Sequence, residues 1–343
     1  CSSDLFNQEH SAPDLRGHTS QLTNHERFVM RKAFALAAAV SLLSFSSAAV
    51  AHVPEGLVLG VWQWPTTHLP VMDGDISEWD VVPDNLWLSA FSEFNGEPLN
   101  TVVAGEVGAE VDAADLNFRW TQGWNDELDR LYFVQDRFDD LWDRDAGGVG
   151  GAGGDDSFEI NIDANHGGDV SWFGADDFDT EEEVARNRGR LNQMSHYRWP
   201  PMEPIGWNWL WASSATWHDT EPYSCCGDSF NLNGAHGTEA TLQAEWWTVA
   251  WDDFDHESPD NSIQHDFVEN EIIGLSISLI DNDIGTDNET DRAFAAWRLG
   301  GQRCGNGDGK CATDFILLPV QNELLPTAVE DDSWGHIKAS YMR

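Results

Sequence analysis

Six aspartates in two short segments have the chemistry of a divalent-cation site. The first group is Asp136, Asp139 and Asp140, and the second is Asp281, Asp283 and Asp287. Calcium binds about six to eight oxygen atoms, mostly from carboxylates and carbonyls. Neither group has the spacing of an EF-hand loop, so each predicts a calcium site of another kind. The competing interpretation is a pair of solvated acidic loops in a very acidic chain.

Tryptophan spacing indicates a second kind of site, a platform for sugar rings. The indoles of Trp207, Trp209 and Trp211 occupy alternate positions, so an extended backbone places all three on one face. Sugar rings stack on flat aromatic faces and need polar groups nearby for their hydroxyls. Trp142 and Trp172 could extend this platform. Burial in the core is the alternative for each indole, because tryptophan is highly buried on average.

Residues 30–51 have the pattern of a secretory signal peptide. The basic start Met30-Arg-Lys32 precedes an apolar run too short to span a membrane, and Ala49-Val-Ala51 forms a cleavage site of small residues. We therefore expect residues 1–29 to be non-native upstream translation, and the mature protein to be secreted or periplasmic.

Cleavage after Ala51 would make His52 the first residue of the mature protein. A terminal amine and an imidazole together can bind copper, as in secreted lytic polysaccharide monooxygenases. A copper-dependent redox protein is therefore an alternative function. The plain interpretation is that cleavage happens to expose a histidine, because the residues that follow carry no supporting motif.

Composition excludes several classes of partner. The chain carries 60 acidic and 18 basic residues, for a net charge of -42. The electrostatic field of so negative a protein repels nucleic acid, anionic lipid and acidic polysaccharide. The expected ligand is therefore neutral. Adaptation to a saline habitat would also explain the charge. So many acids make chance carboxylate pairs inevitable, and no Gly-x-Ser-x-Gly nucleophile motif occurs, so the sequence favours a non-catalytic protein.

Alternating apolar residues predict an all-β fold of two antiparallel sheets packed as a sandwich. In the segment 156–163, Phe158, Ile160 and Ile162 alternate with polar residues, and the segment 272–280 repeats the pattern. Further strands are expected within residues 101–120, 131–135, 240–251, 292–299 and 314–320.

The β-sandwich domain is expected over residues 71–343, after an extended lead-in at 52–70. A long Trp-rich insertion occupies residues 167–236. Within it, Thr180 and Glu183 predict a short helix through a capping box.

The cysteines after the signal peptide favour disulfides in an exported chain. Cys304 and Cys311 bracket a turn-rich segment that a bridge would close, so we predict that these two residues pair. Cys225 and Cys226 are adjacent, and other pairings stay open.

Several short motifs, taken in order, resemble the family 9 carbohydrate-binding modules and their DOMON-like relatives. They are Asp73-Gly-Asp75, Leu131-Tyr-Phe-Val134 ending in Asp136, Asp156 to Asp163, Gly274 to Asp281 with Asp283, and Trp297. Together they cover most of residues 70–320. The resemblance implies a β-sandwich that holds a sugar between two tryptophans, with calcium ions supporting the structure. It also places Glu159 at a position that contacts sugar.

The chain departs from the family pattern at the tryptophan clamp. Gly153 and Gly154 stand where the first tryptophan is expected, and the segment between Cys304 and Cys311 stands where the second is expected. DOMON-like relatives also include haem-binding proteins, which need an axial histidine or methionine pair. The methionines available for that role are Met72, Met194 and Met202.

The sequence therefore predicts a secreted, non-catalytic carbohydrate-binding protein that calcium stabilises. Its predicted partner is a neutral polysaccharide or oligosaccharide, with no nucleic acid and no membrane span. The alternatives are an exported copper- or haem-dependent redox protein and a structural or adhesive surface domain.

Overall fold

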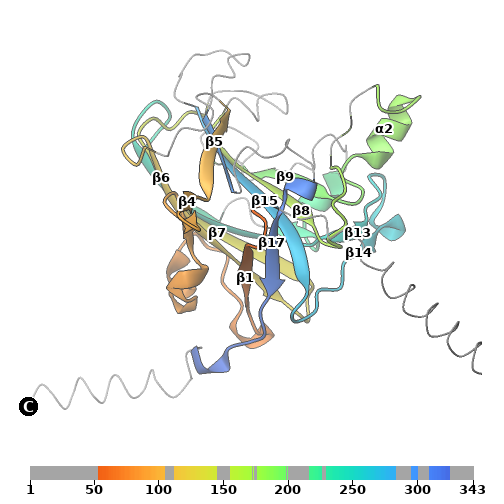
Figure 1. Ribbon diagram of the computed structural model, residues 1–343, viewed down its shortest axis with the longest axis horizontal. Coiled ribbons are helices and arrows are strands. Elements are labelled where there is room, and N and C mark those ends of the chain that lie inside the picture. The colour runs from red at the N-terminus through yellow and green to blue at the C-terminus, as the bar shows by residue number, and fades with distance from the viewer. Residues whose placement is uncertain are drawn as a thin grey trace, which may run out of the picture. The chain divides into compact units, whose positions relative to one another are not determined.

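The computed structural model shows a protein built mostly from strands, which confirms the predicted β class (Figure 1). It describes residues 53–104, 112–144, 155–171, 173, 176–197, 199, 216–225, 229–282, 295–299 and 309–324. The predicted signal peptide lies outside these residues. Within them, no helix is long and apolar enough to cross a membrane.

Sheet A contains the two segments whose alternation predicted strands most clearly. Its strands are β5 (Asn100–Ala104), β8 (Ser157–Asp163), β9 (Gln193–Tyr197), β15 (Ile272–Asp281), β16 (Ala295–Leu299) and β17 (Thr313–Leu317). Strand β8 pairs antiparallel with β15 on one edge and with β9 on the other. The far edge of β15 pairs with β17 and then with β16, and β16 pairs with β5.

Sheet B is built around a long hairpin. Its strands are β2 (Leu88–Ser89), β6 (Leu116–Asn125), β7 (Arg130–Asp139), β10 (Ser224–Cys225), β11 (Phe230–Asn233) and β12 (Ala240–Thr248). Strands β6 and β7 form the hairpin, and β12 pairs antiparallel with the other edge of β7. Short strands complete the two margins, with β2 on β6 and both β10 and β11 on β12.

One strand joins the two sheets and corrects the prediction that all pairing is antiparallel. The first half of β1 (Val58–Gln63) runs parallel to β17 in sheet A, with Val58 opposite Asp314. Its second half runs parallel to β6 in sheet B, with Trp62 opposite Gly123. Because β1 passes from one sheet to the other, the strands form one continuous, mixed, curled sheet. Figure 1 shows β1 beside β17 near the lower end of the strands.

The segment predicted as an insertion extends both sheets as well as carrying a helix. It supplies β9, β10 and β11, together with α2 (Glu181–Asn187). The Oγ1 of Thr180 accepts a hydrogen bond from the backbone N–H of Glu183, which confirms the predicted helix start. Glu183 completes the contact through the Thr180 hydroxyl, which donates to its carboxylate, where a capping box would use the Thr180 backbone N–H.

The remaining elements are short. Two small hairpins are β3 (Glu93–Phe94) with β4 (Glu97–Pro98) and β13 (Trp251–Asp253) with β14 (Ile263–Gln264). Short 3-10 helices are η1 (Thr66–His68), η2 (Ile76–Val81), η3 (Asp84–Leu86), η5 (Thr216–Asp219), η6 (Pro259–Asn261), η8 (Gly309–Cys311) and η9 (Asn322–Leu324).

The main core lies between the sheets, where their apolar faces meet. Sheet A contributes Phe158, and sheet B contributes Phe133 and Trp246. The Trp246 ring stacks on Phe133 with centroids 5.7 Å apart and meets Phe158 edge-on at 5.0 Å. The alternation of side chains along each strand separates an inner from an outer face, because the residues between these apolar positions must point away from the core. Both sheets therefore carry polar residues on their outer faces.

Part of the outer face of sheet B is covered by a second apolar cluster that includes Trp64, Trp79 and Trp247. The buried carboxylate of Glu245 on β12 anchors the turn at Asp73 and Gly74 that leads into this apolar cluster. Its Oε1 accepts hydrogen bonds from the N–H groups of Asp73 and Gly74, at 2.8 and 2.9 Å. Its Oε2 accepts one from the Trp79 indole, at 3.0 Å. Burial raises the pKa of Glu245 to about 7 despite these hydrogen bonds.

The turn at Gly74 requires glycine for two independent reasons. Its φ is +85°, a conformation that residues with a Cβ rarely adopt. A Cβ there would also lie 2.6 Å from the backbone carbon of Phe230. The Asp73-Gly-Asp75 motif is thus explained by close packing of this turn against β11.

Candidate functional site

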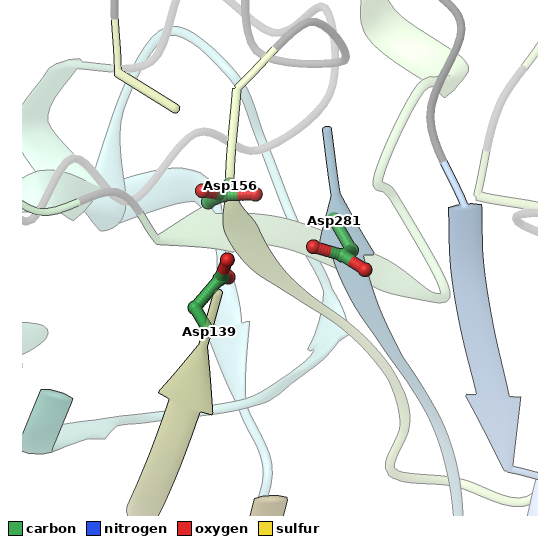
Figure 2. Close-up of side chains that lie close together, drawn as sticks. All are labelled: Asp139, Asp156 and Asp281. Atoms are coloured by element: carbon green, nitrogen blue, oxygen red, sulfur yellow. The ribbon is translucent and has the colours of Figure 1, made fainter. Parts of the chain in front are cut away.

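Three aspartates from distant parts of the chain come together at one end of the sandwich (Figure 2). Asp139 ends β7 of sheet B, Asp156 directly precedes β8 of sheet A, and Asp281 ends β15 beside it. One carboxylate oxygen from each lies within 4.8 Å of the others, and all three residues are buried. The ends of three strands thus build a carboxylate cluster that bridges the two sheets.

The guanidinium of Arg137 lies among these carboxylates. Its Nη2 donates to Asp139 and lies 3.1 Å from Asp156 and 3.6 Å from Asp281. Its Nη1 donates to the Ile280 carbonyl at 3.0 Å. Arg137 precedes Asp139 by two positions on β7, so strand alternation places both side chains on the inner face.

Three buried carboxylates crowd around one guanidinium within the part of the chain that the structure describes. Burial raises the pKa of Asp156 well above its ordinary value, and Arg137 opposes this rise. Burial alone would lower the pKa of Arg137, but Asp139, Asp156 and Asp281 together raise it above its ordinary value. The cluster therefore favours either a retained proton or an additional cation.

Backbone and amide groups fix the orientation of Asp156. One carboxylate oxygen accepts a hydrogen bond from the Asp143 N–H at 2.5 Å, and the other accepts one from the Asn282 N–H at 2.9 Å. The side-chain amide of Asn282 in turn donates to the Asp143 carboxylate at 2.9 Å. The segment after β7 and the segment after β15 are thus held together through Asp156.

The structure regroups the aspartates that the sequence placed in two clusters. Asp139 and Asp281 come from different predicted clusters and meet, whereas Asp136 lies on the opposite face of β7 and pairs with Arg119. Asp140 is exposed and stands outside the cluster. Asp283 and Asp287 lie outside the described residues. Aspartates that are close in sequence do not share one site here, because neighbouring positions on a strand point to opposite faces of the sheet.

Sequence reasoning missed Arg137 and did not assign Asp156 to a site. The spacing of Arg137 and Asp139 at i and i+2 in a predicted strand was the available signal for a same-face ion pair. For Asp156, its place at the start of a buried strand was visible, but its partners on other strands were not.

The carboxylate oxygens of this cluster are of the kind that binds calcium, but some of them already interact with other groups of the protein. Carboxylate oxygens are the ligands that calcium prefers, and the crowding of three carboxylates favours a divalent ion. However, Arg137 lies at the position where all three carboxylates converge. The Asp139 oxygen Oδ1 also accepts a hydrogen bond from the Leu141 N–H at 3.1 Å. A calcium ion would therefore have to bind beside this cluster, and Asp281 is the member farthest from the guanidinium.

Glu159, the residue that the resemblance assigns to sugar contact, pairs with a histidine. Its carboxylate makes a hydrogen bond with Nε2 of His196, and both side chains are buried. The register places His196 on β9, Glu159 on β8 and Ser278 on β15 directly opposite one another. Their apolar neighbours face the core, so this polar row lies on the outer face of sheet A. His196 is a functional candidate that no sequence motif singled out.

The tryptophans predicted as a sugar platform fall into two groups. Trp142 is fully buried in the core, with the Arg137 guanidinium 5.3 Å from its ring centroid. An indole without exposed area offers no face to a sugar in this conformation. Trp172, Trp207, Trp209 and Trp211 lie outside the described residues.

Only some of the remaining predicted residues lie within the described part of the chain. Cys311 is buried in η8 and is disulfide-bonded. Cys304 lies outside the described residues, so its pairing with Cys311 stays a prediction. His52 and Met202 also lie outside them. Met72 packs against the outer cluster of sheet B, whereas Met194 is buried on β9 of sheet A.

Comparison with family models and with curated proteins finds no match to this chain. Among solved structures, the chain is similar to a family 9 carbohydrate-binding module from Caldicellulosiruptor kristjanssonii in complex with cellotriose. The identity is 12% over 79% of this chain and 98% of the module, with a TM-score of 0.44. A module from the same organism and family, in complex with glucose, has 12% identity over 79% of this chain and 99% of its own, with a TM-score of 0.42.

Proposed function

We propose that this protein is an exported, non-catalytic carbohydrate-binding protein whose sugar site includes Glu159. The observation that carries the proposal is the polar row His196, Glu159 and Ser278 across three adjacent strands. A carboxylate, an imidazole and a hydroxyl in one row supply both donors and acceptors at fixed spacing. All three side chains are buried in this conformation, so sugar binding would require the chain that covers them to move. Such groups suit the vicinal hydroxyls of a sugar, and the resemblance places sugar contact at this same glutamate.

The net charge supports a neutral ligand for this site. An overall charge of -42 makes the approach of an acidic polysaccharide unfavourable. Within the proposal, Trp207, Trp209 and Trp211 supply the aromatic surface, because Trp142 is buried in the core.

Replacing Glu159 with glutamine is expected to weaken binding of the recognised polysaccharide about tenfold or more. An amide cannot accept hydrogen bonds at both of its terminal atoms, and it lacks the charge that strengthens those bonds. Retention on insoluble cellulose, xylan and mannan, with dissociation constants for the matching hexasaccharides, measures the effect. The Trp209→Ala variant should lose retention in the same assay without unfolding.

The matched control for this variant is Glu271→Gln. Glu271 also forms a hydrogen bond with a histidine, His265, whose Nε2 lies 3.3 Å from its carboxylate. This control should bind like the wild type. Equal loss in both variants would indicate a general effect on folding, whereas full retention by Glu159→Gln would rule Glu159 out of the sugar site.

We also propose that calcium stabilises the protein, with Asp281 of the carboxylate cluster and Asp283 and Asp287, which follow it in sequence, as candidate ligands. Calcium should then raise the melting temperature, because it offsets the repulsion between the carboxylates and binds only the folded state. A calorimetric titration with chelator and then calcium tests this at constant ionic strength. Sodium alone should stabilise less, since it only screens the repulsion. An equal response to sodium and calcium would mean that the aspartates are solvated.

A further inference from the structure

A groove of about 380 Å³ lies on the outer face of sheet B. Strand β6 contributes Asn117 and Arg119, β7 contributes Asp136 and Phe138, and β12 contributes Thr241. These side chains point away from the core, because the residues between them, such as Phe118 and Leu242, are part of it. Phe118 and Arg137 also line the groove, but each is only 2% exposed. The groove therefore opens on the face of sheet B opposite to the Asp139 side chain.

Strand register arranges the groove in two rows. Asn117, Phe138 and Thr241 lie opposite one another across β6, β7 and β12. In the next row, Arg119 lies opposite Asp136. An aromatic ring is thus flanked by an amide and a hydroxyl, with a charged pair one row away.

The charged pair is held in place but is still accessible. Arg119 Nε donates to Asp136 Oδ2 at 3.1 Å, and the guanidinium lies 4.6 Å from the centroid of the Trp87 ring. The side chains of Arg119 and Asp136 are 49% and 31% exposed. Stacking on Trp87 reduces the freedom of the arginine before any ligand binds, which lowers the entropic cost of recognition.

The chemistry of the groove matches a neutral sugar. Phe138 offers an apolar surface for the C–H face of a pyranose ring, and the surrounding side chains offer donors and acceptors for its hydroxyls. The volume is within the range of small-ligand sites, which is roughly 300–1,000 Å³.

Acidic residues crowd the end of the strands that form the groove. Burial first, and then the charges of Asp115, Asp139, Asp112 and Glu239, raise the pKa of Asp140. The Asp140 N–H donates to the Asp115 carbonyl at 3.0 Å, which places these acids where β7 leaves β6. An anionic sugar would be repelled there, so the neutral class is favoured.

We propose that this groove is a second sugar-binding site, in which Phe138 stacks on a neutral pyranose and Arg119 with Asp136 bind its hydroxyls. The proposal takes its ligand class from the proposed carbohydrate-binding function. It does not depend on Glu159 or on the predicted tryptophan platform. One domain would then contact polysaccharide on the outer faces of both sheets.

The test uses two groove variants, Asp136→Asn and Phe138→Ala, in the full mature protein. Glu182→Gln is the matched control, because Glu182 also forms an exposed ion pair, with Arg186 at 2.9 Å. Binding of cellohexaose, xylohexaose and mannohexaose is measured by calorimetry and by backbone amide shifts in NMR. Both groove variants should weaken binding of the recognised sugar at this site by about tenfold, and the control should not. The wild-type amides of Asn117, Phe138 and Thr241 should shift on sugar addition.

The outcomes separate this inference from the proposed function. Wild-type affinity in both groove variants, together with loss in Glu159→Gln, would overturn the groove site and leave the carbohydrate function standing. Loss in the groove variants alone supports the groove. Absence of binding by the wild type to every sugar would overturn both. Asp136→Asn should melt like the control, because exposed ion pairs contribute little to stability, so a folding defect in Phe138→Ala would not obscure the result.

Discussion

Replacing Arg137 with methionine is expected to lower the free energy of unfolding by about 3–5 kcal/mol, because removal of one partner leaves buried charges uncompensated. In this protein the remaining partners are the carboxylates of Asp139, Asp156 and Asp281, and all are buried. The Ile280 carbonyl would also lose its hydrogen-bond donor. Urea unfolding monitored by tryptophan fluorescence measures the change at pH 7.

The control for this variant is Arg119→Met, which removes an exposed ion pair on the other face of sheet B. Its cost should be about 0–1 kcal/mol, since water screens the pair and solvates the remaining Asp136. Acidification should restore part of the stability of Arg137→Met but not of Arg119→Met, because protons can neutralise the buried carboxylates in place of the guanidinium. Calcium is tested in the same way, and it should stabilise Arg137→Met more than the wild type. Equal stability of the two variants would show that Arg137 does not neutralise the cluster.

The sequence predicted local structure well where one face of a strand is buried. Alternation at Phe158, Ile160 and Ile162 located β8, and their burial in the core follows from that pattern. The Thr180 and Glu183 pair also predicted α2 correctly, because the two residues that mark the helix start lie within one turn of chain. Both features depend on residues that are close in sequence.

The sites depend on contacts between strands that sequence spacing does not reveal. Asp139 and Asp281 were assigned to separate clusters, yet the ends of β7 and β15 bring them together with Asp156. Asp136 was grouped with Asp139, but a separation of three positions places the two side chains on opposite faces of a strand. The partnership of Glu159 with His196 required knowledge that β9 pairs with β8.

The carboxylate cluster and the proposed sugar row share two strands. Asp156 precedes β8, which carries Glu159, and Asp281 ends β15, which carries Ser278. The cluster and the polar row are therefore connected through the hydrogen-bonded pair β8 and β15. We expect that calcium or acidification, by neutralising the cluster, also tightens sugar binding in the same titration.

Lowering the pH from 8 to 5 is expected to raise the melting temperature by on the order of 5 °C, since 1 kcal/mol shifts the melting temperature of a domain of this size by about 2–4 °C. Burial raises the pKa of Glu245 and of Asp219 to about 7 each, from ordinary values of 4.5 and 3.8. Between those ordinary values and pH 7 the folded state holds protons that the unfolded state has released. Stability from these two groups is thus fully present at low pH and is lost as the pH rises through 7.

One buried histidine opposes this trend. Burial lowers the pKa of His218 to about 3, so below pH 6.5 the unfolded state binds a proton that the folded state does not. Two acids outweigh one histidine between about pH 4.5 and 6.5, and the raised pKa of Asp156 adds to the acids. Stability should therefore be greatest near pH 4 to 5.

Glu245→Gln tests one of the two acidic contributions by calorimetry across the pH series. The variant should lose part of the rise in melting temperature between pH 8 and 5, because an amide at this position binds no proton. At pH 8 its stability should approach that of the wild type, whose ionised Glu245 is buried against Asp73, Gly74 and Trp79. Glu269→Gln, at an exposed position, should keep the full rise. A wild-type melting temperature that falls steadily from pH 8 to 5 would contradict the assignment of protons to these buried acids.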